Sequence, residues 1–221
     1  MLTKFFKDRA EAGRFLAQKL VQYADRPDVI VLALPRGGVP VAYEVAQTLK
    51  APLDVFVVRK LGVPGFEECA VGAIASGGIR VLNERVVSYL HIPAEVVDEI
   101  TAMAFSELER RERLYRGTRA PMDVTGQTVI LVDDGLATGS TMRAAVKALR
   151  KKNPKKIVVA VPVGERETCD SFKKEVDTIA VCAITPEPFQ AVGLWYRNFS
   201  QTTDAEVQQL LRMAQQTKAA A

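Results

Sequence analysis

The chain has 221 residues, of which 48% are hydrophobic and 25% are charged, an ordinary balance for a soluble globular protein with one full-sized core. Its formal net charge of +4 is mild, and no apolar run approaches the length that spans a membrane. The N-terminal segment is unlike a signal peptide, and no linker rich in Ser, Pro or Gly divides the chain. These features argue against a membrane protein and predict a single cytoplasmic domain.

Much of the positive charge lies in one segment, KALRKKNPKK, which spans residues 147–156. A nucleic-acid patch is one interpretation of this segment. The other is a solvated helix end, where cations complement the helix dipole and Asn153-Pro154 stops the helix. The absence of interleaved aromatic residues favours the helix end, so we do not expect nucleic acid as a partner.

The cysteines indicate no covalent or metal framework. Cys69, Cys169 and Cys182 are far apart in the sequence and form no CxxC pair. Neither a disulfide framework nor a zinc site is indicated, and reduced thiols are expected.

Hydrophobic periodicity predicts the elements of the first half of the chain. In chain order these are an amphipathic helix over residues 5–23, a buried strand over 28–34, a helix over 39–50 and a second buried strand over 52–60. The segment LGVPGFEEC, from residue 61, is typical of a loop, and the residues after it predict a hairpin that turns at Gly77-Gly78. Pro93 then precedes a long, heavily charged helix over residues 95–116.

Strands and helices alternate in the second half of the chain. We expect strands over residues 128–132, 156–163 and 178–184, and helices over 141–151, 167–175 and 204–213. The alternation predicts an α/β fold in which helices cover both faces of a parallel sheet. Ligands of such sheets bind at the carboxyl ends of the strands, where the sequence places PRGG, VRK and DDGLATGST. We therefore expect these three polar loops to share one rim.

The stretch VILVDDGLATGST, residues 129–141, joins two adjacent carboxylates to a loop of small residues that leads into a helix. Such a loop presents backbone amides and hydroxyls to an anion, and the helix dipole adds about 0.3 to 1 kcal/mol. Each carboxylate can accept a hydrogen bond from one hydroxyl of a vicinal diol. No GxxxxGK[ST] occurs and no GxGxxG follows the first strand, so the ligand implied is a ribose 5-phosphate. The alternative is a buried strand whose acidic end merely caps a helix.

The stretch VILVDDGLATGSTM resembles the signature of the type I phosphoribosyltransferases, in a less characterised bacterial branch. This family binds 5-phosphoribosyl 1-pyrophosphate (PRPP) with Mg²⁺ and transfers its ribosyl phosphate to a nitrogen acceptor. The resemblance implies one domain with a parallel sheet core flanked by helices, over about residues 28–184. It also implies a flexible loop with an inserted hairpin and long helix over about residues 61–116, and a C-terminal hood and helix over about residues 185–217.

The same resemblance implies roles for residues of the three loops. Asp133 and Asp134 would bind the ribose hydroxyls and contact Mg²⁺ through water. The other residues implied to bind PRPP are Gly37, Gly38, Gly135, Ala137, Thr138, Gly139, Ser140 and Thr141. Arg36, Arg59 and Lys60 would be the catalytic cations that meet the leaving pyrophosphate.

Two further features of the family bear on these loops. Its loop at the position of PRGG often contains a strained peptide bond. The segment LGVPGFEECAVGAI is similar to its mobile lid, which excludes water from the site. For Arg59 and Lys60 the alternative is a pair of solvated charges at a strand edge.

The acceptor is less well defined than the donor. Ala137 departs from family members that act on 6-oxopurines, which carry an aspartate there, and this argues against a hypoxanthine or guanine salvage enzyme. In the hood segment TPEPFQAVGLWYRNF, Phe189, Trp195 and Tyr196 are candidates to stack on a planar acceptor. The same aromatic side chains could instead pack the C-terminal helix onto the core, and both interpretations stay open.

The long helix over residues 93–116 has no counterpart in the best-known salvage enzymes. Arg110, Arg111 and Arg113 could reach toward the site or toward a partner subunit. A solvated helix with Glu/Arg pairs is the favoured account. His91, just before this helix, is not expected to be catalytic.

We therefore predict a Mg²⁺-dependent phosphoribosyltransferase whose partners are PRPP and a nitrogen acceptor such as a nucleobase. The first alternative is a non-catalytic sensor of PRPP or a nucleotide. The second is an enzyme that acts on another sugar phosphate. No membrane partner is expected, and a homodimer is an arrangement that the sequence leaves open.

Overall fold

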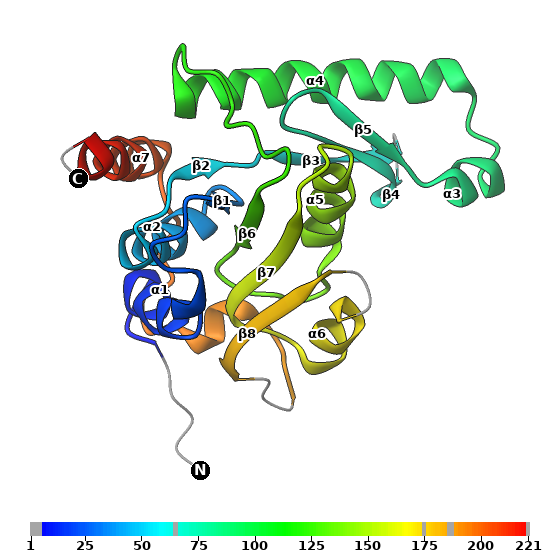
Figure 1. The fold of residues 1–221 in the computed structure, drawn as a ribbon. Helices are drawn as coiled ribbons and strands as arrows, with labels where there is room; N and C mark the ends of the chain where they lie inside the picture. Colours follow the sequence, from blue (N-terminus) through cyan, green and yellow to red (C-terminus); the bar gives the residue numbers. More distant parts are fainter. Residues whose placement is uncertain (1–5, 64–65, 174–175, 185–187, 220–221) are drawn as a thin grey trace. The chain divides into compact units, whose positions relative to one another are not determined.

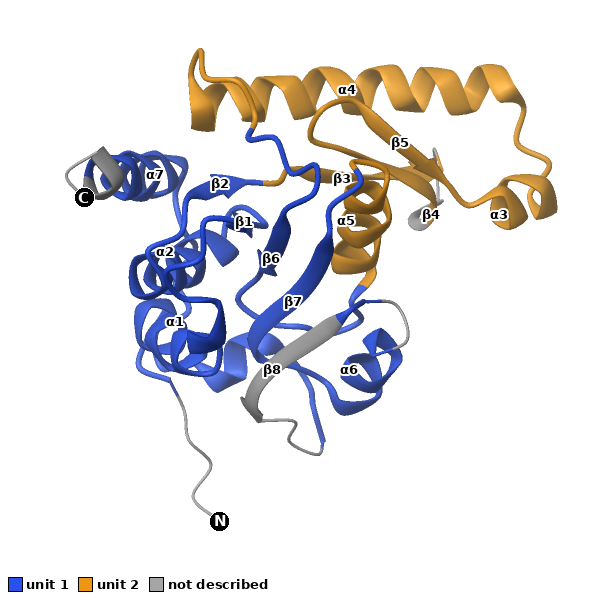
Figure 2. Ribbon diagram, viewed as in Figure 1, with its two compact units in different colours: residues 1–55, 122–139, 153–221 blue, residues 56–121, 140–152 orange. Residues whose placement is uncertain are grey.

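The computed structural model describes residues 6–63, 66–173, 176–184 and 188–219. The chain divides into two compact units, shown in different colours in Figure 2: residues 1–55, 122–139 and 153–221 form unit 1, and residues 56–121 and 140–152 form unit 2. The elements of unit 1 are α1 (Arg9–Gln18), η1 (Val21–Tyr23), β1 (Val29–Ala33), α2 (Gly38–Leu49), β2 (Leu53–Val55), β6 (Thr128–Val132), β7 (Lys156–Val163), α6 (Arg166–Phe172), β8 (Thr178–Ile184), η2 (Val192–Trp195) and α7 (Asp204–Ala219) (Figure 1). Those of unit 2 are β3 (Val58–Val63), β4 (Phe66–Ala75), β5 (Ile79–Leu82), α3 (Glu84–Tyr89), α4 (Ala94–Arg116) and α5 (Ser140–Arg150).

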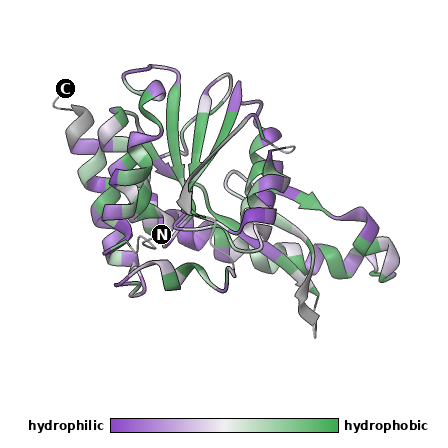
Figure 3. Cartoon of the chain, turned by 90° about the horizontal axis from the view of Figure 1, so that it is seen from below, coloured by the Kyte–Doolittle hydropathy of each residue, from purple (hydrophilic) through white to green (hydrophobic). Residues whose placement is uncertain are grey.

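Unit 1 is built on a parallel sheet with the strand order β2-β1-β6-β7-β8. Every residue of β1 and of β6 is buried, as expected for parallel strands with layers on both faces. Helices α1 and α2 lie on one side of this sheet and α6 on the other (Figure 1), and hydrophobic residues run along its strands (Figure 3). The α/β fold expected from the alternation of strands and helices is confirmed, with β6 at the centre of the sheet.

Unit 2 contains an antiparallel sheet with the strand order β3-β4-β5. The predicted hairpin is confirmed, because β4 and β5 pair across a turn in which Gly77 and Gly78 have φ angles of +82° and +73°. The long helix is confirmed as α4, whose N-cap is Pro93. Its buried residues include Val97, Ile100, Ala104 and Leu108, whose spacing of three and four residues forms a single stripe.

The predicted strand over residues 52–60 is wrong as a single element. It is divided into β2, which pairs with β1 in unit 1, and β3, which pairs with β4 in unit 2. Between them the Val57 amide donates to Ser76 Oγ at 2.8 Å, and the Ser76 amide donates to the Val57 carbonyl at 2.9 Å. The apolar run continues through this change of sheet, so its hydrophobicity could not reveal that the hydrogen-bonding partner changes.

The predicted loop after residue 60 is also corrected. Residues 61–63 belong to β3 and residues 66–69 to β4, while residues 64–65 lie outside the described part of the chain. The pairing shifts register between Leu61 and Gly62 and again between Gly62 and Val63. Such bulges combine glycine with irregular pairing, which explains why the sequence is typical of a loop although the backbone forms strands. A lid function for this segment stays a prediction.

The first helix is shorter than its periodicity predicts. It begins at Arg9 because the Asp8 side chain accepts a hydrogen bond from the Glu11 amide and caps the first turn. Phe6, expected on the same helical stripe, instead forms an isolated bridge with Tyr196. Among the described residues, no helix combines the length and the apolar character needed to cross a membrane.

The central position of β6 leads to a stability prediction. Ile130 is fully buried in β6, so we expect Ile130→Ala to lower the free energy of unfolding by about 2 to 5 kcal/mol through lost burial and a cavity. Val21, whose exposed fraction is 57%, is the control, and Val21→Ala should change stability by less than about 0.5 kcal/mol. Urea unfolding followed by circular dichroism measures both. Similar midpoint shifts for the two variants would contradict the assignment of β6 to the core.

Candidate functional site

Two of the three predicted polar loops leave the same edge of the sheet in unit 1. Strands β1 and β6 are parallel neighbours whose last residues, Ala33 and Val132, are paired. The PRGG loop therefore starts beside the acidic pair, and the Leu34 amide donates to the Val132 carbonyl at 2.9 Å. The peptide bond between Pro35 and Arg36 is cis.

The close contact between the two loops requires glycine at position 37. A Cβ atom on Gly37 would lie 2.1 Å from Asp134 Oδ2, a separation that no real side chain adopts. Gly38, the first residue of α2, lies against the same strand end, with Val132 O 2.8 Å from where its Cβ would be. The PRGG backbone therefore touches the acidic pair itself, and its predicted contact with PRPP stays a prediction.

The adjacent carboxylates differ in their surroundings. Asp133 Oδ1 accepts a hydrogen bond from the Asp134 amide at 2.9 Å. Burial, with the neighbouring charge of Asp134, raises the pKa of Asp133 well above its ordinary value. Burial also raises the pKa of Asp134, although the hydrogen bond from Arg9 opposes that shift. Two carboxylates held this close together favour the binding of a cation or of a hydroxyl donor on their solvent side.

Arg9 is a component of this site that sequence reasoning missed. Its Nε atom donates to Asp134 Oδ2 at 2.8 Å, and the two side chains are only 12% and 15% exposed. Its Nη1 atom donates to the Ser200 carbonyl at 2.8 Å, and its guanidinium carbon lies 3.9 Å from the ring centroid of Phe199. No sequence signal identified Arg9, because the helix was predicted to begin at residue 5 and Arg9 enters the first turn only in the observed α1.

The aromatic residues of the hood segment pack into the interior of unit 1. Trp195 and Tyr196 are buried in a cluster with Phe6, Ala12 and Val163, and the partly buried Phe189 packs against it. The Tyr196 hydroxyl donates to the carbonyl of Asp134. Burial and the charge of Asp134 raise the pKa of that hydroxyl.

Of the two roles predicted for these aromatic side chains, the structure shows packing. Their partners in the cluster are Phe6 and Ala12 at the start of the chain, whereas the packing role left open by the sequence named the C-terminal helix. Acceptor binding by Phe189, Trp195 and Tyr196 stays a prediction. Residues 185–187 of the hood segment lie outside the described residues.

The predicted phosphate loop, residues 135–141, connects β6 to α5. Gly135, Leu136, Ala137 and Thr138 precede Gly139, whose φ of +70° suits glycine. Ala137 and Thr138 are exposed in unit 1, and Ser140 and Thr141 are exposed in the first turn of α5 in unit 2. The expected order of small residues leading into a helix is present, and phosphate binding by these residues stays a prediction.

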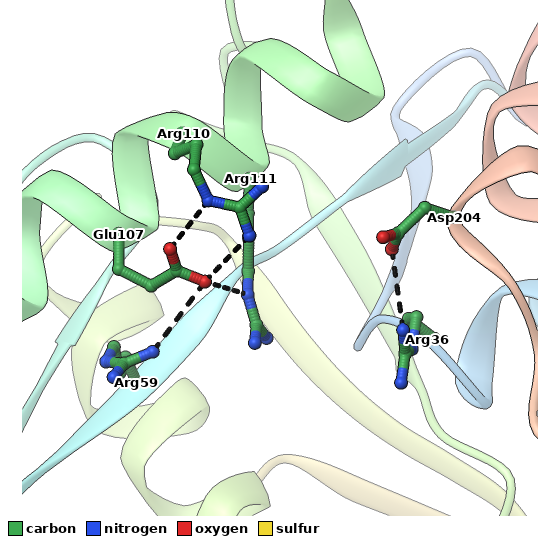
Figure 4. A network of polar contacts seen from close by, with 6 residues as sticks. All are labelled: Arg36, Arg59, Glu107, Arg110, Arg111 and Asp204. Atoms are coloured by element: carbon green, nitrogen blue, oxygen red, sulfur yellow. Dashed lines mark hydrogen bonds and ion pairs between the residues drawn. The ribbon is translucent and has the colours of Figure 1, made fainter.

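The predicted catalytic cations occupy both units. In unit 1, Arg36 Nη1 lies 3.8 Å from Asp204 Oδ1, at the start of α7 (Figure 4). In unit 2, Arg59 and Lys60 are exposed residues of β3, and Arg59 Nη1 lies 3.9 Å from Glu107 Oε1 on α4. Their expected position at the carboxyl end of a parallel strand is wrong, because the chain has already joined the antiparallel sheet.

The carboxylates of unit 1 suit Mg²⁺ only if a bound ligand supplies further oxygen atoms to the metal. No group of three or more His, Cys, Asp or Glu side chains is arranged to hold a metal within the described part of the chain. Mg²⁺ is commonly held by one or two carboxylates together with substrate oxygens and water. Asp133 and Asp134 supply hard oxygen ligands of this kind, and burial, the main cause of their raised pKa values, disfavours the ionised forms that a bound cation would stabilise.

The described cysteine is no candidate nucleophile. Cys169 is a buried residue of α6, and burial raises the pKa of its thiol to about 11. Its thiolate is therefore scarce at neutral pH. The side chains of Cys69 and Cys182 lie outside the described residues.

Comparison with known proteins gives the family. Residues 6–193 match the model of the phosphoribosyl transferase domain. The chain belongs to this family. The acidic pair, the PRGG loop and the phosphate loop all lie within the matched residues of the phosphoribosyl transferase domain.

The chain is also similar to individual proteins. The Mycobacterium tuberculosis H37Rv protein named "Putative phosphoribosyl transferase Rv0571c" is 49% identical over 204 residues, which are 92% of this chain and 46% of that protein. The crystal structure of TT1426 from Thermus thermophilus is similar with a TM-score of 0.81 at 38% identity, covering 94% of this chain and 97% of that one. A "Bifunctional protein PyrR" of Halalkalibacterium halodurans is 36% identical over 117 residues, which are 47% of this chain and 63% of that protein. The chain spans about half the length of the mycobacterial relative.

The Arg9–Asp134 pair leads to a second prediction. Arg9→Gln leaves a buried carboxylate without its cation, so the free energy of unfolding should fall by about 2 to 3 kcal/mol, somewhat less than for a fully buried pair. Arg9→Lys keeps the charge and should recover part of this loss. Lys50→Gln breaks the exposed pair with Asp25, whose side chains are 72% and 66% exposed, and should cost less than about 1 kcal/mol. Urea denaturation compares the variants, and equal losses at the two sites would contradict a structural role for Arg9.

Proposed function

We propose that this protein is a phosphoribosyltransferase that moves the 5-phosphoribosyl group of PRPP to a nitrogen acceptor and releases pyrophosphate. The observation that carries the proposal is the contact between PRGG and the acidic pair, with Gly37 directly against Asp134. A diol-binding carboxylate pair, a phosphate loop and a glycine-rich turn at one sheet edge suit a ligand that carries hydroxyls and phosphates on one sugar. Membership of the phosphoribosyl transferase domain family supports the same donor.

The proposed binding mode assigns a part of PRPP to each loop. Asp133 and Asp134 accept hydrogen bonds from the ribose hydroxyls, and Arg9 keeps Asp134 oriented for this contact. The amides and hydroxyls of residues 135–141 bind the 5-phosphate, assisted by the positive end of the α5 dipole. The amides of Gly37 and Gly38 bind the pyrophosphate together with Arg36. Arg59 and Lys60, which belong to unit 2, are the further cations that the family resemblance assigns to the pyrophosphate.

The proposed reaction breaks the bond between the anomeric carbon and the pyrophosphate oxygen and forms a bond from that carbon to the acceptor nitrogen. Negative charge gathers on the departing pyrophosphate, so donors that strengthen toward it lower the barrier. Arg36 and Arg59 suit this task because their present carboxylate partners are 3.8 and 3.9 Å away, longer than the roughly 2.7–2.9 Å of a strong charge-assisted bond. Mg²⁺, when bound, would neutralise charge on the diphosphate.

We further propose a nucleobase as the acceptor class. Ala137 has no side-chain donor or acceptor and so gives no hydrogen bond to a 6-oxopurine, which favours another base. Acceptor contacts by Phe189, Trp195 or Tyr196 require a free ring face. Since Trp195 and Tyr196 are buried, the partly buried Phe189 is the better candidate of the three.

Turnover tests the proposed function directly. The protein, incubated with PRPP, Mg²⁺ and a panel of purine and pyrimidine bases, should release pyrophosphate with at least one base. EDTA should abolish this release, and added Mg²⁺ should restore it, because the described residues alone form no complete metal site. Tight PRPP binding without turnover on any base would favour the sensor alternative over the enzyme.

The role of the acidic pair is tested by a single substitution. Asp134→Asn removes the negative charge and leaves the size of the side chain unchanged, so we expect PRPP affinity in calorimetry to fall at least about tenfold, the loss of roughly one charge-assisted hydrogen bond. Asp170→Asn, in an exposed pair with Lys173 on α6, is the matched control and should leave affinity unchanged. Circular dichroism confirms that both variants are folded. Equal PRPP affinity for Asp134→Asn and the wild type would show that the carboxylate does not bind the ribose.

A further inference from the structure

Unit 2 contains a cluster of three arginines around one glutamate, which comprises Arg59 of β3 and Glu107, Arg110 and Arg111 of α4 (Figure 4). Arg110 binds the carboxylate with two hydrogen bonds, from Nε to Oε2 at 2.7 Å and from Nη2 to Oε1 at 3.0 Å. Arg111 Nε donates to Oε1 at 2.9 Å, and Arg59 Nη1 lies 3.9 Å from the same oxygen. Three guanidinium groups from two elements therefore surround one carboxylate.

The cluster carries more positive than negative charge. Hydrogen bonds from Arg110 and Arg111 lower the pKa of Glu107 to about 2, so its carboxylate is ionised at neutral pH. Because Arg110 binds the Glu107 carboxylate through two hydrogen bonds, its positive charge is paired with the negative charge of that group. Arg59 and Arg111 then bring two further positive charges to the same oxygen, which gives the four residues a formal charge of +2 (three Arg, one Glu).

The geometry of Arg59 and Arg111 suits a diphosphate. Their distances of 3.9 and 2.9 Å to Glu107 Oε1 place the two nitrogens no more than 6.8 Å apart, the sum of those distances. One anion with two phosphate groups can contact both. The side chains of Arg59 and Arg111 are 45% and 41% exposed, so a ligand from solvent can reach them.

Buried residues lie next to the cluster in both elements. Leu108, the neighbour of Glu107, is buried at 1% exposure, and Leu61 in β3 is fully buried. Glu107 is therefore fixed on the side of α4 that adjoins β3, and Arg110 holds its carboxylate in one orientation. In contrast, the contact of Arg59 exceeds the length of a hydrogen bond, so phosphate oxygens at shorter distances would replace it at small cost.

We propose that Arg59 and Arg111 form a diphosphate-binding site on unit 2, with Glu107 as the residue that positions them and Arg110 as its clamp. This inference rests on the proposed function, because Arg59 is one of the cations assigned to the pyrophosphate of PRPP. It adds α4 to the binding machinery and gives Arg111 a role. The competing account is a solvated helix whose Glu/Arg pairs each contribute about 0.2–0.5 kcal/mol and bind nothing.

Calorimetry with inorganic pyrophosphate tests the site on the full chain. Arg111→Gln should weaken pyrophosphate binding about tenfold, the effect of one lost charge-assisted contact. Arg113→Gln is the matched control, because Arg113 is an exposed arginine of the same helix and loses the same charge. Its affinity should stay within about twofold of the wild type. Equal losses of pyrophosphate affinity in both variants would show that the helix attracts the anion only through its general positive charge. That result would overturn the proposal.

Glu107→Gln distinguishes positioning from charge. Removal of a negative charge near an anion site should by itself strengthen pyrophosphate binding, whereas loss of the positioning carboxylate should weaken it. We expect weaker binding, by about three- to tenfold, with an unchanged urea midpoint to exclude unfolding. Stronger binding would show that Glu107 only repels the ligand and would overturn its role.

The same measurements separate this inference from the proposed function. If the wild type turns over PRPP and Arg111→Gln binds pyrophosphate normally, the inference fails and the proposed function stands. If no base supports turnover and yet Arg111→Gln loses pyrophosphate affinity and Arg113→Gln retains it, the diphosphate site stands and the proposed reaction fails.

Discussion

The burial of two adjacent carboxylates at the end of β6 is the constraint on which the candidate site depends. Burial disfavours both charges, and the structure compensates by directing Arg9, from 125 positions earlier in the sequence, against Asp134. The Tyr196 hydroxyl holds the backbone at the same residue. The start of α1, the PRGG turn and the hood segment thus all converge on Asp134, which a simple helix-capping carboxylate would not require.

The second organising feature is the change of sheet after β2. Up to Val55 the chain belongs to a parallel sheet, and from Val58 it belongs to an antiparallel one. This change moves Arg59 and Lys60 from a loop at a strand end to the surface of β3, where a helix can supply partners. Glu107 on α4 is such a partner, so the long inserted helix gains a connection with a residue that the family resemblance marks as functional.

The two predicted catalytic arginines have the same kind of partner. Each lies just under 4 Å from a carboxylate, Arg36 from Asp204 and Arg59 from Glu107. A contact of this length is longer than a hydrogen bond, so each guanidinium can exchange its carboxylate for a closer anion.

The sequence by itself determined the buried strands, the hairpin at Gly77-Gly78, the long helix and the family signature, because hydrophobic spacing, turn residues and the order of small residues in a loop are local properties. Only the tertiary structure decided which sheet residues 58–60 would join, that Arg9 pairs with Asp134, and that Trp195 and Tyr196 pack against Phe6. Each of these depends on a partner far away in the chain. The periodicity of a segment records that one of its faces is buried, but it carries no information about which distant residue buries it.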